Sequence, residues 1–488
     1  MEEVVIVGGG PVGLMLACEL SLGGVRPVVL EKRTEPSTLP KANGLVGQIV
    51  ELLDHRGLLE RFSAGSPFSG RAPGFPFAGV PLSFEGIDGP VPRLLLVQQP
   101  RLEQLLAERA GELGVEIRRG REVRSLTQDA DGVTLDLGDE RIRARYAVGC
   151  DGAHSLVREQ AGIAFPGSTD AEGLVIGHFR TTAGVFDSLE ADGLQPGWTR
   201  TPHGRVLLTS LQDGVLIAGV REPAVLPDGT ITPDDFRAAL RRVLGRDLPL
   251  GEPIWLSSTR AQARLADRYR AGRVFVAGDA AHLFPAGGSA LNTGMTDAVN
   301  LAWKLAAVLR ERVPEALLDT YESERRPIGE RTLMQARAQA AIDRVEEEDG
   351  LALRELLGEV FAFAEPARHL AGLLRDAGLP YGSPEHPLTG RFVPDLDGLE
   401  LADGGRVAEL LRAGRPVLLD LGGGAEPPEP DGGRPDGGWI DVVRARCDHP
   451  PADTLLIRPD GYVAWAGTDG LAGAAQEWFG ASVTTSPA

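Results

Sequence analysis

The stretch EVVIVGGGPVGLMLACELSLGGVRPVVLEK, residues 3–32, decides the fold of this chain. Its uninterrupted apolar run at 4–7 is typical of a buried strand in a parallel sheet. Apolar residues at helical spacing follow at 14–20 and predict a helix. A second run, PVVLEK at 27–32, predicts another strand. A strand, a helix and a strand in this order predict a βαβ unit with two parallel strands.

A GxGxxG motif, made of Gly8, Gly10 and Gly13, lies at the turn between the first strand and the helix. In such a turn the first glycine permits a tight bend and the second lets a pyrophosphate approach the backbone. The third lets the helix pack closely on the strand. Pro11 and Val12 begin the helix, whose amide groups then receive the phosphates. The pattern predicts that the chain binds a dinucleotide.

A carboxylate, Glu31, ends the second predicted strand, 18 residues after Gly13. A carboxylate at this place accepts hydrogen bonds from ribose hydroxyls and disfavours a 2′-phosphate. It therefore favours FAD or NAD over NADP as the bound dinucleotide. Lys32, which follows it, is a further candidate contact to the cofactor.

Two more predicted strands end on glycine and a carboxylate. ARYAVGCDGAHSLVREQAG at 144–162 predicts a strand ending at Asp151, with a helix starting soon after it. RVFVAGDAAHLFPAGGSALNTGMTDAVNL at 273–301 predicts a strand ending at Asp279. Together with the turn at Gly8, three predicted strands therefore end at glycine or carboxylate residues. In an open α/β sheet, ligands bind at the carboxyl ends of the strands.

Composition and charge restrict the class of protein. At 488 residues the chain is too long for one core, which predicts two or three domains. A net charge of −19 argues against nucleic acid or an anionic membrane as a partner. There is no run of 18 apolar residues and no basic region before an apolar one at the start. Cys18, Cys150 and Cys447 lie far apart without a CxxC pair, so we expect a cytoplasmic protein without disulfides.

Three motifs, in their order and spacing, resemble those of the class A flavoprotein aromatic hydroxylases, the family of para-hydroxybenzoate hydroxylase and phenol hydroxylase. They are GGGPVG at 8–13, CDGAHSLVR at 150–158 and GDAAHLFPAGGSALNTGMTDAVNLAWKL at 278–305, with YESERRP at 321–327 after them. The resemblance is strong over roughly residues 1–340. Within the family, the chain resembles most the branch that hydroxylates aromatic polyketides.

The resemblance implies an α/β fold with three parts. A Rossmann-like FAD-binding domain of the para-hydroxybenzoate hydroxylase fold is expected at 1–165 and 266–385. A substrate-binding domain with an antiparallel sheet is expected at 166–265. A thioredoxin-like domain is expected at 386–488, and without a CxxC pair we expect no redox role for it.

Local patterns outside the motifs predict further elements. The stretch GWTRTPHGRVLLTSLQDGVLIAGVRE alternates apolar and polar residues around His203-Gly204 and Asp213-Gly214, which are hairpin signals. Apolar spacing predicts a long helical region from about 294 to 345. The C-terminal part predicts a strand, a helix, a strand and a terminal strand pair.

By the resemblance, Asp279 accepts hydrogen bonds from the ribityl hydroxyls of FAD. The loop after it places bare backbone amides against the isoalloxazine, and the candidate residues are Gly287, Gly288, Leu291 and Asn292. Backbone donors there stabilise the negative charge of reduced flavin, as an oxyanion hole does. The positive N-terminal end of the following helix acts on the same charge.

The resemblance also implies roles for residues of the other motifs. Gln99 would touch the flavin or its diphosphate. Asp151 and Gly152 would serve both FAD and the incoming nicotinamide, with Arg158 supporting their loop. His282 is expected to pack or cap at the helix start rather than to act as a base. We assign no catalytic side chain and, in the absence of any typical ligand spacing, no metal site.

The chain departs from the family pattern at two places. Where the family usually has two arginines after the second strand, PKANGLVGQIVELLDHRGL at 40–58 has Lys41 and Gln48. Lysine neutralises a phosphate as a point charge but lacks the bidentate fork of arginine. The common GGQG is GGSA here, which places Ser289 and Ala290 beside the flavin.

The function implied is that of an FAD-dependent, NAD(P)H-consuming monooxygenase. It would hydroxylate an aromatic, polycyclic polyketide with O2 through a flavin C4a-hydroperoxide, with the protein supplying orientation and a dry pocket. Two alternatives stay open: a Baeyer–Villiger oxygen insertion on a polyketide, and a non-catalytic flavoprotein that binds an unstable intermediate. A flavin halogenase would need a WxWxIP segment, which is absent. Either a monomer or a homodimer is compatible with the sequence.

Overall fold

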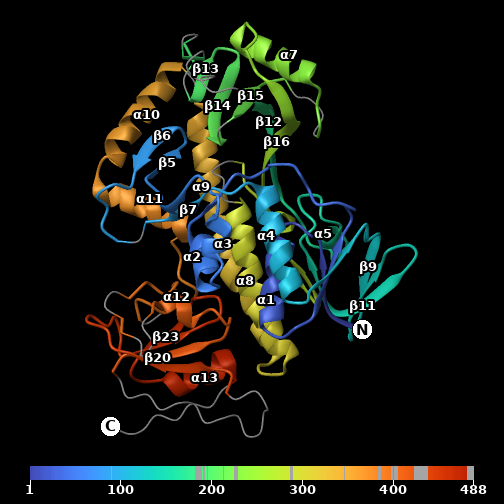
Figure 1. Cartoon of the computed structure of the whole chain (residues 1–488), viewed down its shortest axis with the longest axis vertical. Helices are drawn as coiled ribbons and strands as arrows, with labels where there is room; N and C mark the ends of the chain where they lie inside the picture. Colours follow the sequence, from blue (N-terminus) through green and yellow to red (C-terminus); the bar gives the residue numbers. More distant parts are fainter. Residues whose placement is uncertain are drawn as a thin grey trace.

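The computed structural model describes residues 1–89, 91–181, 189–190, 193–194, 196–212, 214–224, 229–285, 290–345, 347–376, 378–382, 386–396, 399–400, 405–422 and 438–480. Figure 1 shows three parts along the long axis of the molecule. A sheet flanked by long helices forms the middle. An antiparallel sheet lies at one end, and a smaller sheet near the C-terminus lies at the other.

The sheet in the middle has eight strands. They are β1 (Glu2–Val7), β2 (Pro27–Glu31), β8 (Glu116–Arg119), β9 (Ser125–Gln128), β10 (Val133–Asp136), β11 (Arg141–Gly149), β17 (Arg270–Ala271) and β18 (Val274–Val276). Strands β18, β11, β1, β2 and β8 are parallel neighbours in this order. The predicted βαβ unit is confirmed, because β1 and β2 pair in parallel with Val5 opposite Val28.

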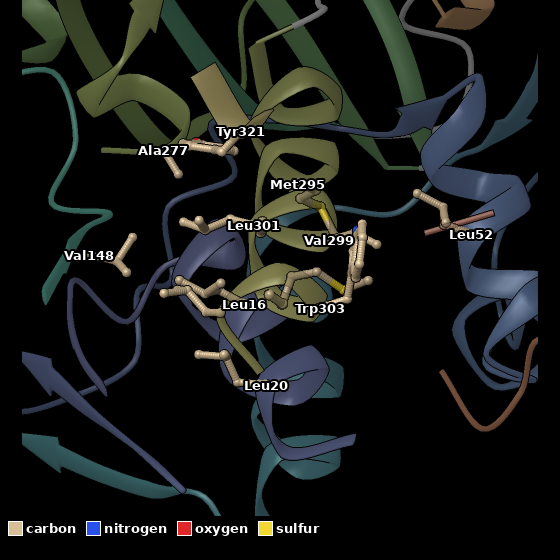
Figure 2. Packing of buried hydrophobic residues seen from close by; sticks show 14 of the residues in the cluster. Leu16, Leu20, Leu52, Val148, Ala277, Met295, Val299, Leu301, Trp303 and Tyr321 are labelled. Atoms are coloured by element: carbon tan, nitrogen blue, oxygen red, sulfur yellow. The ribbon is translucent and has the colours of Figure 1, made fainter. Parts of the chain in front are cut away.

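The main core lies between this sheet and three helices. These are α1 (Pro11–Leu22), α4 (Gln99–Glu112) and α8 (Ala290–Leu309). Val4 and Ile6 of β1 belong to the cluster formed with these helices, whereas Val5 and Val7 belong to the cluster on the other face of the sheet. Figure 2 shows Leu16 of α1 among the buried side chains of α8. Helix α8 is buried on nearly all sides, which explains why it is apolar around most of its circumference.

The helical region predicted from about 294 to 345 is present and consists of two helices. Helix α8 ends at Leu309, and α9 (Asp319–Arg344) begins after the short 3-10 helix η2 (Glu315–Leu318). Glu311 has a φ of 55°, in the left-handed region, and Pro314 comes three residues later. The left-handed conformation at Glu311 interrupts the helical backbone, and Pro314, which lacks an N–H group, disfavours a helical residue before it.

The second sheet is antiparallel, with the order β13, β14, β15, β12, β16, β19. Its strands are β12 (Gly167–Arg180), β13 (Gly197–Thr201), β14 (Gly204–Gln212), β15 (Val215–Glu222), β16 (Glu252–Leu265) and β19 (His282–Leu283). The predicted hairpin at His203-Gly204 is confirmed by the pairing of Thr201 with Gly204. Asp213 of the second expected hairpin lies outside the described residues, but β14 and β15 pair as that hairpin requires. Helix α7 (Pro233–Leu244) covers one face of the sheet.

The C-terminal sheet has the order β21, β20, β22, β23. Its elements are α12 (Val407–Leu410), β20 (Val417–Asp420), β21 (Asp441–Arg444), β22 (Thr454–Ile457), β23 (Val463–Gly467) and α13 (Leu471–Phe479). Strands β20 and β21 are parallel, and the other pairs are antiparallel. The predicted helix, strand and terminal strand pair are present as α12, β20 and the pair β22 and β23, with β21 as an additional strand. The strand predicted before the helix is not found among the described residues, where Phe392 and Glu400 make only isolated bridges. Residues 423–437 between β20 and β21 lie outside the described part.

The remaining elements connect these three parts. They are β3 (Leu45–Val46), β4 (Ser69–Arg71), β5 (Gly74–Phe77), β6 (Val80–Ser83), β7 (Arg93–Leu95), α2 (Gln48–His55), α3 (Leu59–Ser63), α5 (Leu156–Gln160), η1 (Gly278–Ala280), α10 (Glu347–Phe361) and α11 (Ala364–Asp376). Within the part of the chain that the structure describes, no helix has both the length and the apolar composition needed to cross a bilayer.

Candidate functional site

A cavity of about 600 Å³ opens at the carboxyl edge of the parallel strands. Val7 of β1, Leu30 of β2, Cys150 after β11 and Ala277 after β18 all line it. The residues predicted from sequence that line this cavity are Gly8, Gly10, Pro11, Val12, Glu31, Lys32, Lys41, Gln99, Asp151, Gly152, Asp279, Ala290 and Leu291. A larger surface groove of about 840 Å³ lies beside α9, where ion-paired arginines line it, and it contains none of the predicted residues.

The glycines of the first turn serve two different purposes. Gly8 has a φ of 109°, and a Cβ added at Gly13 would lie 2.0 Å from the Gly8 carbonyl oxygen. The fold itself therefore requires these two glycines. A Cβ added at Gly10 would meet no atom within 4 Å. The protein leaves that space open beside the N-terminus of α1, which has no side-chain cap, and such a cradle fits a phosphate group.

The Glu31 carboxylate is held in place at the end of β2. Its Oε2 accepts a hydrogen bond of 2.7 Å from the backbone N–H of Gly9. Its Oε1 accepts one of 2.8 Å from the backbone N–H of Arg33. The side chain is buried at the edge of the cavity. Both oxygens keep lone pairs for further donors, as contact with ribose hydroxyls requires. Lys32 lines the same cavity and is exposed.

The Asp151 carboxylate is engaged within the protein. One oxygen accepts the hydroxyl of Ser155, and the other accepts the N–H of Val157 at 3.1 Å. Burial raises the pKa of Asp151 in spite of these hydrogen bonds. Ser155 in turn caps α5, so the helix predicted to start near it is confirmed. The next residue, Gly152, has a φ of 86° and would leave a Cβ in open space, so bare backbone faces the cavity here.

Arg158 joins two of the strand-end loops. Its guanidinium donates to the carbonyl of Ala280 at 3.0 Å and to that of Ala153 at 3.1 Å. It also lies over the ring of Phe165, 3.9 Å from the centroid. The loop after β11 and the turn after β18 are therefore fixed to each other.

Asp279 lies open to the cavity in the turn that follows β18. Gly278 before it has a φ of 64°, and a Cβ there would lie 2.9 Å from Val12 Cγ2, so this turn also requires glycine. The carboxylate is exposed to the cavity, while protein surrounds its other sides. This enclosure raises the pKa of Asp279, against the opposing effects of His282 and Lys41. Lys41 lines the same cavity and faces the carboxylate as a compensating cation.

His282 is fully buried and does not line the cavity. Its Nε2 lies 2.7 Å from Asp297 Oδ2, and its ring stacks on Phe284 at 4.8 Å. Burial raises the pKa of Asp297, but Arg325 and His282 outweigh burial and hold it below its usual range. Asp297 is thus ionised and can only accept, so His282 Nε2 carries the proton. The geometry is that of a packed, oriented histidine rather than of a base open to substrate.

Two predicted residues cannot be placed among the described ones, and two described residues, Asn292 and Gly13, do not line the cavity. Gly287 and Gly288, and Ser289 after them, lie outside the described residues. Asn292 faces away from the cavity, because its Oδ1 accepts the N–H of Val46 in β3 at 2.9 Å. Gly13 contacts Gly8 inside the turn instead of lining the cavity.

The sequence reasoning missed several lining residues. Glu103 accepts a hydrogen bond of 2.8 Å from Gln99 Nε2, and burial raises its pKa. The sequence did contain a signal for this contact, because residues four apart, such as Gln99 and Glu103, lie on the same face of a helix. Arg33 and Arg121 also line the cavity. The two arginines come together because β2 and β8 pair in parallel, with Glu31 opposite Arg119. This pairing joins distant segments, so no local sequence pattern predicts it.

Comparison with known proteins assigns the chain to a family. A family model described as an FAD binding domain matches residues 1–336, and one described as the C-terminal region of aromatic-ring hydroxylases matches residues 386–482. The chain belongs to the FAD-dependent aromatic hydroxylases. The family, the fold class and the FAD-dependent monooxygenase activity expected from the three motifs are confirmed. In this aromatic hydroxylase the open cradle at Gly10 and the carboxylate at Glu31 fit FAD.

Three relatives cover almost the whole hydroxylase chain. The 12-dehydrotetracycline 5-monooxygenase/anhydrotetracycline 6-monooxygenase of Streptomyces rimosus is 42% identical over 98% of this chain and 99% of its own. The structure of an aromatic hydroxylase from angucycline biosynthesis is 36% identical, covers 99% of both chains and has a TM-score of 0.87. The structure of a Diels–Alderase from the biosynthetic pathway of pyrroindomycins is 38% identical, covers 98% of this chain and 100% of its own, and has a TM-score of 0.84.

Proposed function

We propose that this aromatic hydroxylase uses bound FAD, NAD(P)H and O2 to hydroxylate an aromatic polyketide in the cytoplasm. The observation that carries the proposal is the cavity where an open glycine cradle, a fixed carboxylate at Glu31 and the Asp279 turn meet. The tetracycline relative, which covers nearly the whole chain, supports the polyketide substrate.

The lining residues have separate tasks in holding FAD. The backbone at Gly10 and the start of α1 would receive the pyrophosphate, with Lys41 as a nearby cation. Glu31 would accept hydrogen bonds from the adenosine ribose, and Asp279 from the ribityl chain. Bound FAD supplies the redox chemistry with O2. The protein would orient it, exclude water and supply amide groups to it. By the family resemblance, the expected amides are those of Leu291 and of Gly287 and Gly288, which lie outside the described residues.

The domains proposed for these tasks are 1–165 with 266–385 for FAD, 166–265 for substrate and 386–488 for support. Strand β19 starts three residues after Asp279 and pairs with β16. The edge of the antiparallel sheet is therefore close in sequence to a residue that lines the cavity. On the sheet face that α7 leaves uncovered, Leu207, Gly219 and Ile176 lie in one row across three strands. This apolar row would suit a flat aromatic substrate.

Anaerobic reduction of the bound flavin by NADPH and by NADH tests the proposal. The bleaching of the flavin absorbance would be followed with and without a panel of polycyclic phenols and quinones. We expect one class of ligand to accelerate reduction strongly. In a separate aerobic reaction under ¹⁸O2, the same ligand should give a product that has gained one ¹⁸O atom. Reduction at the same fast rate with every ligand and with none would contradict substrate-gated hydroxylation.

The Diels–Alderase relative gives a specific reason to keep a second candidate. On this reading the protein binds FAD and a reactive polyketide but inserts no oxygen. Conversion of the substrate without NAD(P)H consumption and without ¹⁸O in the product would establish it. A Baeyer–Villiger insertion would also incorporate ¹⁸O, and an ester or lactone oxygen in the product would identify it.

A further inference from the structure

The Asp279 turn is held from behind by Asp297 of α8. Besides His282, Asp297 Oδ2 accepts the backbone N–H of Gly278 at 3.3 Å. Asp297 is fully buried. The same helix begins with Ala290 and Leu291, which line the cavity. One carboxylate therefore sets the position of the turn relative to the helix start on the other side of the cavity.

Arg325 of α9 neutralises this carboxylate. Its Nε donates to Asp297 Oδ1 at 2.8 Å, and it is 1% exposed. The other end of the guanidinium donates to the hydroxyl oxygen of Tyr381 at 2.9 Å and to Thr296 Oγ1 at 2.7 Å. A guanidinium is a rigid fork, so the position of Tyr381 fixes the angle at which Arg325 meets Asp297.

Tyr381 is tied to the C-terminal sheet. Its ring stacks on that of Tyr462 at 4.0 Å and 17°. Its backbone N–H donates to the carbonyl of Gly390, whose own N–H donates to Val463 of β23. Tyr462 lies in the turn between β22 and β23, and burial of both rings keeps the stack free of solvent.

Tyr462 is also connected to the start of α8 by a second route, without lining the cavity itself. Its hydroxyl donates to Gln48 Oε1 at 3.2 Å, and Gln48 begins α2. Two residues earlier, the N–H of Val46 donates to Asn292 in the first turn of α8. The two tyrosines thus support the start of α8 through Gln48 and the Asp279 turn through Arg325. Gln48 and Asn292 do not line the cavity, and their role in this arrangement is to connect α2 and β3 to neighbouring elements.

We propose that Tyr381 and Tyr462 are positioning residues for FAD, and that the thioredoxin-like sheet acts on the flavin site through them. The role concerns FAD binding alone and holds whichever substrate the enzyme takes. It also explains why a sheet without a CxxC pair is packed against α8 and α9. Neither tyrosine touches the cavity, so any effect on FAD passes through Arg325, Asp297 and Gln48.

FAD titration of the apoprotein tests the proposal in the full chain. Tyr381→Phe removes the acceptor for Arg325 and keeps the stack, and Tyr462→Phe removes the donor to Gln48. We expect each substitution to raise the FAD dissociation constant about tenfold, the effect of one hydrogen bond involving a buried or charged partner. The circular dichroism of the bound flavin should change, while the apoprotein Tm stays within about 3 °C of the wild type.

Tyr146→Phe is the matched control, because Tyr146 is a buried tyrosine of β11 with no hydroxyl hydrogen bond among the described residues. It should bind FAD as the wild type does. Arg325→Lys is the second variant, because lysine keeps the charge but cannot bridge Asp297 and Tyr381 as a fork. It should show the same loss of affinity. Wild-type FAD affinity in both tyrosine variants overturns the proposal, as does an equal loss in Tyr146→Phe.

Discussion

Arg458, in the turn after β22, and Glu324, in α9, form a buried ion pair with two parallel hydrogen bonds of 2.7 and 2.8 Å. The same guanidinium donates to Asp460, and Lys304 of α8 donates to Glu324 at 2.7 Å. All four side chains are buried. Two cations and two anions thus compensate each other where the C-terminal sheet meets the helices of the FAD-binding part.

Breaking this cluster should destabilise the whole protein. Arg458→Met leaves the carboxylates of Glu324 and Asp460 buried beside a single cation. Loss of one partner from a buried ion pair costs about 3–5 kcal/mol. We expect a fall in the free energy of unfolding of this size, seen as a lower Tm in calorimetry. Arg61→Ala is the control, because Arg61 pairs with the exposed Glu108 and Glu112, and its loss should lower the free energy of unfolding far less. Equal effects of the two substitutions would contradict this account.

The cluster should also make stability depend on acid pH. Burial raises the pKa of Glu324, but Arg458 and Lys304 outweigh burial and lower it from 4.5 to about 2. The folded state therefore binds this proton more weakly than the unfolded chain. Its contribution, about 3 kcal/mol, is fully present above pH 4.5 and is lost as the pH falls towards 2.

Glu324→Gln measures this contribution. The difference in Tm between wild type and variant should be largest above pH 5 and should shrink steadily towards pH 2. The buried Lys304, whose pKa is lowered by burial to about 8, stays charged through this range. A difference in Tm that does not change between pH 6 and pH 2 would exclude Glu324 as the titrating group.

The three glycines of the first turn should respond differently to alanine. Gly10→Ala adds a methyl group that meets no protein atom within 4 Å, so the apoprotein should keep its Tm. The methyl group occupies the cradle, so FAD affinity should fall more than about tenfold, as for a lost hydrogen bond to a charged group. Gly13→Ala forces a Cβ to 2.0 Å from a carbonyl oxygen and should destabilise the apoprotein by about 1–3 kcal/mol. Titration with FAD and apoprotein Tm separate the two effects, and a destabilised Gly10→Ala apoprotein would refute the assignment.

Loss of the carboxylate at Glu31 should weaken FAD binding. Glu31→Gln keeps the shape but replaces a charged acceptor with a neutral amide, so we expect an FAD dissociation constant about ten- to a hundredfold higher. Quenching of flavin fluorescence during titration gives this constant. Glu35→Gln removes an exposed carboxylate four residues on and serves as the control. Equal affinities for Glu31→Gln and wild type would remove Glu31 from the site.

Much of the candidate cofactor site was predictable because its signals are local. The turn at Gly8, the strand end at Glu31 and the strand end at Asp279 are each encoded within a few residues of sequence. Parallel strands bring such ends to one edge of the sheet, so separate local patterns converge on one cavity. The hairpin at His203-Gly204 was predictable for the same reason.

Other features depended on pairing between distant segments. Asn292 was expected beside the flavin from its place in the motif, yet its side chain bonds to Val46, 246 positions away in the chain. Arg121 reaches the cavity only because β8 lies beside β2. Periodicity alone did not divide the helical region, which is interrupted between Leu309 and Glu315.

The sequence by itself determined the βαβ unit, the glycine turn and the carboxylates at the strand ends, because backbone sterics and hydrophobic periodicity act over a few residues. Only the tertiary structure decided which buried charges meet. Asp297 with Arg325, and Glu324 with Arg458, come from segments far apart in the chain. The free energy of a buried charge depends on the partner that folding brings within about 3 Å, and no local pattern records that partner.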